Sequence, residues 1–236
     1  MTDDGSRPLA RVLALHGFAQ DAETFRGKIG AIRKALKSTH EFVLLDAPHD
    51  VRGAFSSATE LASLGASSAG TSRAWFTSGE SARAGASRST DEGWTRPALS
   101  REYVGFDESL AAIRTVIEER GPFDGVIGFS QGATCAVAAL ATIEELRTSA
   151  RFVVLVAGFE PLDENMLASV RAAAPLAMKS LHVHGESDAL VTRERMTSLA
   201  EHFAAASREF WFHDGAHGVP SSALAKFLKT WLAPTS

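Results

Sequence analysis

The stretch Gly125-Val126-Ile127-Gly128-Phe129-Ser130-Gln131-Gly132-Ala133 decides the fold. It begins as a short apolar run typical of a buried strand, and helix-forming residues follow it as far as Leu140. A G-x-S-x-G motif between a strand and a helix is typical of a nucleophile elbow, a tight turn that pushes the serine hydroxyl out above a sheet. The sequence therefore predicts a strand, a sharp turn at Ser130 and a helix whose N-terminus favours an anion.

Apolar strands and amphipathic helices alternate on both sides of this stretch. Besides 125–129, we predict strands over residues 11–15, 42–45, 152–156, 180–184 and 209–212. We predict helices over 25–36, 106–117, 133–146, 193–205 and 224–231. This alternation predicts an α/β fold, with a mostly parallel sheet flanked by helices on both faces.

The segment from about 49 to 100 interrupts the alternation. It is rich in Ser, Ala, Gly and Arg, it shows no clear strand, and residues 65–70 and 78–89 have a flexible composition. We expect it to be a loop-rich insertion over the active-site end of the sheet, anchored by Trp75 and Phe76. Residues 1–8 are predicted to be a flexible tail, and residues 9–236 a single domain.

Composition excludes several classes of protein. The net charge of −4 gives no nucleic-acid footprint, and no apolar run is long enough to span a membrane. A polar, acidic N-terminus and a single cysteine, Cys135, favour a reducing, cytoplasmic location. We expect Cys135 to be a small buried side chain rather than a nucleophile. The chain is expected to be a monomer or a homodimer.

Three polar residues follow predicted strands in the chain order Ser130, Asp188, His217. The carboxyl ends of parallel strands lie at one edge of the sheet, so these side chains should meet there. A serine hydroxyl needs a base such as histidine, and a carboxylate that orients it. We therefore predict Ser130 as nucleophile, His217 as base and Asp188 as its partner, with Asp163 and Asp214 as rivals for the acid.

Attack by a serine also requires donors for the negative oxygen that forms. The backbone N–H of Gln131, directly after the serine, is one candidate. The backbone N–H of Phe18, in the loop after the first strand, is the other, because Gly17 lets that loop turn. We expect His16 to be a structural hydrogen-bonding residue rather than a base.

The run His182-Val183-His184-Gly185-Glu186-Ser187-Asp188 superficially resembles a metal-binding motif. Alanine follows Asp188 where that motif has a histidine, and both histidines lie on one face of a predicted buried strand. The expectation is no metal and no cofactor. No phosphate-binding glycine loop follows the first strand.

Several motifs together resemble the FSH-type family of serine hydrolases, whose members include fungal proteins and an esterase named for an association with ovarian cancer. These are Leu15-His16-Gly17-Phe18, Asp46-Ala47-Pro48-His49, the run 121–133, Gly158-Phe159, 181–188 and 213–217. The resemblance implies an α/β-hydrolase fold without a separate large cap domain, and ester hydrolysis by Ser130, Asp188 and His217. Residues 51–72 depart from the family pattern as an insertion.

Three functions are compatible with these residues. The first is a serine esterase for small or medium-to-long acyl groups, with Trp75, Phe76, Phe159, Val191 and Val219 as candidate substrate-binding residues. The second is a thioesterase acting on an acyl group bound to coenzyme A or to an acyl carrier protein. Four arginines of the insertion could contact an acidic carrier surface, or could simply keep an exposed loop soluble: Arg73, Arg83, Arg88 and Arg96. The third is a non-catalytic ligand-binding protein, which an intact Ser-His-Asp set disfavours.

Overall fold

A six-stranded parallel sheet forms the centre of the computed structural model, which describes residues 8–55, 59 and 72–233. The strand order is β10-β9-β8-β7-β1-β2, and each neighbouring pair is parallel. The strands are β1 (Ala10–Leu15), β2 (His40–Leu45), β7 (Gly125–Phe129), β8 (Phe152–Val156), β9 (Lys179–Gly185) and β10 (Arg208–His213). Every strand predicted for this sheet lies within an observed one, and the predicted fold class is confirmed.

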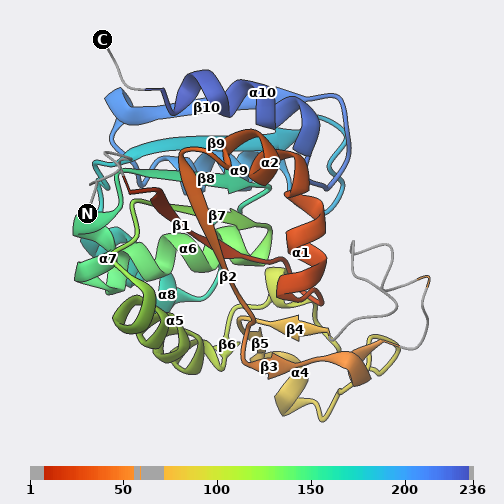
Figure 1. Ribbon diagram of the computed structural model, residues 1–236. Helices are drawn as coiled ribbons and strands as arrows, with labels where there is room; N and C mark the ends of the chain where they lie inside the picture. Colours follow the sequence, from red (N-terminus) through yellow and green to blue (C-terminus); the bar gives the residue numbers. More distant parts are fainter. Residues whose placement is uncertain (1–7, 56–58, 60–71, 234–236) are drawn as a thin grey trace.

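Helices cover both faces of the sheet (Figure 1). Successive residues of β1 alternate between two cores: Leu13 and Leu15 pack into one, and Val12 and Ala14 into the other. The first core includes residues of α5 (Phe106–Arg120), α6 (Gln131–Thr142), α7 (Glu144–Ser149), α8 (Glu164–Ala173) and α9 (Arg193–Ala200). The second includes residues of α1 (Ala22–Lys28), α2 (Gly30–Leu36) and α10 (Ser221–Trp231).

The helix boundaries differ from the predictions at several places. The helix predicted over 25–36 is divided into α1 and α2 at Ile29, whose φ of −94° and ψ of 15° are not helical, although its side chain keeps its place in the core. The helix after Ser130 ends at Thr142, and α7 follows it separately. The helix α9 ends at Ala200, five residues early, and α8 was not predicted.

The insertion contains short regular elements that the sequence pattern did not reveal. Two antiparallel pairs form. Within the insertion, β3 (His49–Asp50) pairs with β4 (Arg73–Ala74), and β5 (Thr77–Ser78) pairs with β6 (Tyr103–Val104), which directly follows the insertion. The insertion also contains three short helical segments, η1 (Arg52–Ala54), α4 (Gly79–Arg83) and η2 (Pro97–Leu99). A further short segment outside the insertion, η3 (Ala205–Ser207), precedes β10. The expectation of no strand here is therefore corrected: two-residue strands show no periodicity.

Part of the predicted flexible sequence is ordered, because Ser78 caps α4 by accepting a hydrogen bond from the N–H of Ser81. Residues 65–70 and the predicted tail, apart from Pro8, lie outside the described residues.

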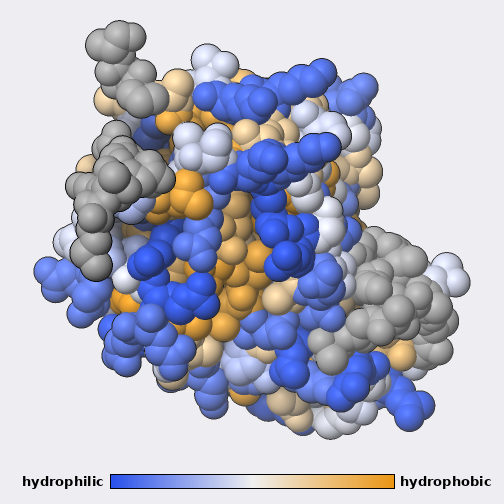
Figure 2. Space-filling model, in the orientation of Figure 1, coloured by the Kyte–Doolittle hydropathy of each residue, from blue (hydrophilic) through white to orange (hydrophobic). Residues whose placement is uncertain are grey.

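Figure 2 shows apolar surface between charged rims where Figure 1 places the edge strand β2. Among the described helices, none is long and apolar enough to cross a bilayer.

Candidate active site

Ser130 occupies a strained turn between β7 and α6. Its φ of 53° and ψ of −119° lie in a region that side chains rarely adopt. The turn is possible because the two flanking residues are glycines, which have no Cβ. A Cβ on Gly128 would lie 2.5 Å from the carbonyl oxygen of Gly132, and a Cβ on Gly132 would lie 2.3 Å from the carbonyl oxygen of His16. The N–H of Ser130 donates to the carbonyl of Val156 on β8 at 2.8 Å. The predicted elbow is therefore present.

A chain of hydrogen bonds links the three residues that follow strands. The distance from Ser130 Oγ to His217 Nε2 is 3.0 Å, and from His217 Nδ1 to Asp188 Oδ2 it is 2.8 Å. The carboxylate can only accept, so His217 Nδ1 carries the proton and Nε2 is left to accept from the serine hydroxyl. This arrangement can remove a proton from Ser130.

Asp188 is held for this task by its own backbone neighbours. Its Oδ1 accepts from the N–H groups of Leu190 and Val191 at 2.8 and 2.9 Å, and its side chain is fully buried. Burial by itself raises the pKa of the Asp188 carboxyl, but the hydrogen bonds from His217 and the two N–H groups outweigh it, so the pKa lies below the usual range. The carboxylate therefore stays ionised beside His217.

The rival acids lie in other roles. Asp163 caps α8 by accepting from the N–H of Met166 at 2.8 Å, and it also accepts from the N–H of Tyr103. Asp214 offers its backbone carbonyl to the hydroxyl of Ser187. Cys135 is fully buried on α6, where burial raises the pKa of its thiol, in keeping with the expected apolar role.

The loop after β1 is shaped by His16. Its Nε2 accepts from the N–H of Ala47 at 3.0 Å, so Nδ1 carries the proton and donates to the carbonyl of Gly17 at 2.8 Å. Burial lowers the pKa of His16, which keeps the ring neutral. His16 therefore fixes the backbone that leads to Phe18, as expected for a structural hydrogen-bonding residue.

The side chain of Gln131 joins the elbow to the insertion. Its Oε1 accepts from the N–H of Trp75 at 2.9 Å, and its Nε2 donates to the carbonyl of Phe76 at 2.8 Å. The indole N–H of Trp75 donates to the carbonyl of His16 at 2.8 Å. Because Gln131 is the first residue of α6, its backbone N–H has no acceptor within the helix.

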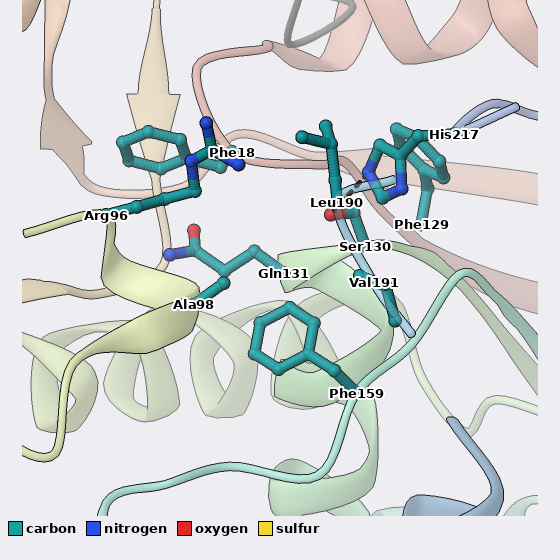
Figure 3. Close-up of a pocket in the computed structure, with 10 residues that line it drawn as sticks. All are labelled: Phe18, Arg96, Ala98, Phe129, Ser130, Gln131, Phe159, Leu190, Val191 and His217. Atoms are coloured by element: carbon teal, nitrogen blue, oxygen red, sulfur yellow. Dashed lines mark hydrogen bonds between the residues drawn. The ribbon is translucent and has the colours of Figure 1, made fainter. Parts of the chain in front are cut away.

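A small cavity opens beside the serine, with a volume of about 30 Å³ (Figure 3). It is lined by Phe18, Arg96, Ala98, Phe129, Ser130, Gln131, Phe159, Leu190, Val191 and His217. Of the residues predicted to bind substrate, Phe159 and Val191 are in this lining. Arg96 and Ala98 come from the insertion. The sequence singled out Arg96 only as one of four arginines that could face a carrier protein, and it did not point to Ala98.

Trp75, Phe76 and Val219, the other residues predicted to bind substrate, are not in the lining of this cavity. Trp75 is fully buried in the first core and donates a hydrogen bond to the carbonyl of His16, and Phe76 stacks on the ring of Tyr103 with 4.0 Å between the ring centroids. Val219 packs on the core that includes α10. Trp75 and Phe76 anchor the insertion through their hydrogen bonds to Gln131 and His16, as the sequence predicted.

His182 and His184 lie on β9, and the structure gives each a packing role. His182 is fully buried between the rings of Phe203 and Phe210, and its Nε2 lies 3.1 Å from the hydroxyl of Ser180. His184 packs against Phe212. Within the described part of the chain, no group of three or more His, Cys, Asp or Glu residues is placed to hold a metal ion.

Known proteins resemble this chain over most of its length. Esterase OVCA2 of Homo sapiens is 35% identical over 223 residues, which are 92% of this chain and 92% of the relative. Esterase C25G4.2 of Caenorhabditis elegans is 34% identical, over 94% of this chain and 91% of the relative. Rhodanese-like domain-containing protein 6 of Arabidopsis thaliana is 32% identical over 93% of this chain, but the match spans only 38% of that longer relative.

Solved structures confirm the fold. Arabidopsis thaliana SOBER1 superposes with a TM-score of 0.61 at 15% identity, over 95% of this chain and 98% of SOBER1. A monoacylglycerol lipase of Paleococcus ferrophilus gives a TM-score of 0.59 at 13% identity, over 94% and 93% of the two chains. The family model described as serine hydrolase (FSH1) matches residues 6–227. This chain therefore belongs to the FSH1 family of serine hydrolases.

Proposed function

We propose that this chain hydrolyses carboxylic esters through an acyl-enzyme formed on Ser130. The observation that carries the proposal is the chain of hydrogen bonds of 3.0 and 2.8 Å from Ser130 through His217 to Asp188, at a strained elbow. Membership of the FSH1 family and relatives named as esterases support the reaction class.

In the proposed first half-reaction, Ser130 Oγ attacks the ester carbonyl carbon while His217 Nε2 takes its proton. The negative oxygen of the tetrahedral intermediate accepts hydrogen bonds from the backbone N–H groups of Phe18 and Gln131, and each such donor contributes roughly 3–4 kcal/mol in hydrolases of this kind. The C–O bond to the alcohol then breaks, and the alkoxide takes the proton from His217. Asp188 keeps its charge throughout and stabilises the imidazolium.

In the second half-reaction, His217 removes a proton from water, and the hydroxide attacks the acyl carbon on Ser130. The second tetrahedral intermediate uses the same two N–H donors. Its collapse releases the carboxylic acid and returns the proton to Ser130 Oγ. Besides substrate and water, each step uses only Ser130, His217, Asp188 and the two backbone N–H donors.

We also propose that the acyl group is a hydrocarbon chain. Phe159 and Val191 give the cavity an apolar wall, which suits a hydrocarbon chain. The volume of about 30 Å³ is far below the roughly 300 Å³ of an ordinary ligand pocket, so part of the lining must move, or the chain must extend outside it. A thioester would follow the same steps, with a thiolate as leaving group.

Turnover of matched ethyl esters and ethyl thioesters of butanoate, octanoate and dodecanoate tests this proposal. The parent chain should release acid from at least one series, and Ser130→Ala should abolish it. Ester or thioester preference follows from the ratio of kcat/KM within each pair. Acid release that survives Ser130→Ala would refute the proposed mechanism.

A further inference from the structure

A guanidinium group lies in the wall of the cavity that contains the reactive serine. Arg96 lines this cavity together with Ser130 and His217. Figure 3 shows the Arg96 side chain extending from the insertion on the same side of the cavity as Phe18, with Ser130 and His217 on the other side. Most of the remaining lining is apolar, so a positive charge here needs an explanation.

Within the described residues, no carboxylate lies within 4.0 Å of the Arg96 guanidinium. Two other arginines of the insertion have carboxylate partners, since Arg52 contacts Asp50 and Arg83 contacts Glu102. Arg73 and Arg88, like Arg96, have no ion-pair partner among the described residues, but they lie outside the cavity lining. The acid near the cavity, Asp188, is fully buried and already engaged with His217 and two backbone N–H groups. Among the described residues, no carboxylate therefore compensates the positive charge of Arg96 at this cavity.

The backbone around Arg96 is held in place from both sides. The N–H of Thr95 donates to Ser81 Oγ at 2.7 Å, and that hydroxyl donates to the carbonyl of Thr95 at 3.1 Å. On the other side, Pro97 is buried, and the N–H of Leu99 donates to the carbonyl of Arg96 at 2.8 Å. The side chain thus starts from a fixed point at the rim of the cavity.

We propose that Arg96 is a specificity-determining residue that selects esters bearing a second, anionic group. A guanidinium binds a carboxylate through two parallel hydrogen bonds, and an apolar surrounding strengthens this contact. The substrate class is therefore a half-ester of a dicarboxylic acid, or an ester of a hydroxy acid, with the free carboxylate a few bonds from the scissile carbonyl. This inference rests on the proposed ester hydrolysis and adds the charge of the substrate to it.

The test compares kcat/KM for charged and neutral esters of matched length. One arm places the charge on the acyl side, with monoethyl adipate against ethyl hexanoate. The other places it on the alcohol side, with 4-acetoxybutanoate against butyl acetate. Both are measured for the parent, Arg96→Gln, Arg96→Lys and Arg101→Gln, the last removing an exposed charge of the same segment that lies outside the cavity lining.

We expect the parent to prefer the charged ester in one arm, which identifies the side that carries the carboxylate. Arg96→Gln should lower this charged-to-neutral ratio by about tenfold or more, Arg96→Lys should restore part of it, and Arg101→Gln should leave it close to the parent value. The ratio should also fall as salt is added. A parent without charge preference in either arm would overturn the inference.

Two further outcomes separate this inference from the proposed function. An equal loss for charged and neutral esters in Arg96→Gln would mean that Arg96 assists the reaction itself rather than selecting substrate, and would overturn it. If no ester is hydrolysed, the proposed function fails first, and calorimetric binding of monoethyl adipate against the neutral ethyl hexanoate still tests Arg96. Tighter binding of monoethyl adipate that is lost in Arg96→Gln supports the inference, and equal binding of the two esters contradicts it.

Discussion

Replacing Gln131 with methionine tests how the elbow is joined to the insertion. The substitution keeps the length and approximate volume of the side chain but removes both of its hydrogen bonds. The N–H of Trp75 loses its acceptor at 2.9 Å, and the carbonyl of Phe76 loses its donor at 2.8 Å. Both residues are fully buried, so water cannot replace the lost partners.

The magnitude follows from these two groups. A buried polar group left without a partner costs about 1–3 kcal/mol, so Gln131→Met should lower the free energy of unfolding by roughly 2–6 kcal/mol. Ser109→Ala removes one hydrogen bond, of 2.5 Å, to the carbonyl of Trp75 and should cost about 1–3 kcal/mol. Thr148→Val is the control, because it removes an exposed hydrogen bond to the carbonyl of Glu144 and should change stability by less than about 0.5 kcal/mol.

Urea unfolding followed by tryptophan fluorescence measures these free energies, and ester hydrolysis measures the effect on the site. Because the backbone N–H of Gln131 is proposed to bind the transition state, kcat should fall more than KM changes in Gln131→Met. A Gln131→Met variant within about 0.5 kcal/mol of the parent, with unchanged kcat, would refute the reasoning.

Two further predictions concern acid stability and packing at the elbow. Burial lowers the pKa of His182 from 6.5 to about 3. Between these two pH values the His182 ring is protonated in the unfolded chain but neutral in the folded chain. The stability that the neutral, buried ring contributes is therefore complete above pH 6.5 and is lost as the pH falls towards 3. Urea unfolding should therefore show that His182→Phe loses about 2 kcal/mol less stability than the parent between pH 7 and pH 5, and equal losses would contradict this. Gly132→Ala places a Cβ 2.3 Å from the carbonyl oxygens of Leu15 and His16 and should destabilise the chain by at least about 1–3 kcal/mol, whereas Gly30→Ala, which has open space, should stabilise it by up to about 1 kcal/mol in the same measurement.

The central sheet could be predicted from sequence because its strands are short apolar runs with clear ends. Residues 125–129 and 152–156 match the observed strands, since each is buried along its whole length. The meeting of Ser130, Asp188 and His217 also followed from the sequence, because parallel strands bring the residues after them to one edge. Their hydrogen-bond distances required coordinates.

The insertion could not be predicted in the same way. Its strands have two residues each, too few to show alternation, and its aromatic residues could not be assigned to core or pocket from composition. Trp75 and Phe76 proved to be core residues, while Arg96 and Ala98 reached the cavity. The places of Trp75 and Phe76 depend on their hydrogen bonds with Gln131, which join segments more than 50 residues apart in the sequence.

The measurement that tests the central claim most directly is the intact mass of the protein after treatment with a fluorophosphonate, followed by peptide mapping. The account predicts one adduct, on Ser130, absent in Ser130→Ala and formed much more slowly in His217→Ala. No adduct on the folded parent, or an adduct on another residue with Ser130 unmodified, would contradict the claim that His217 and Asp188 activate this serine.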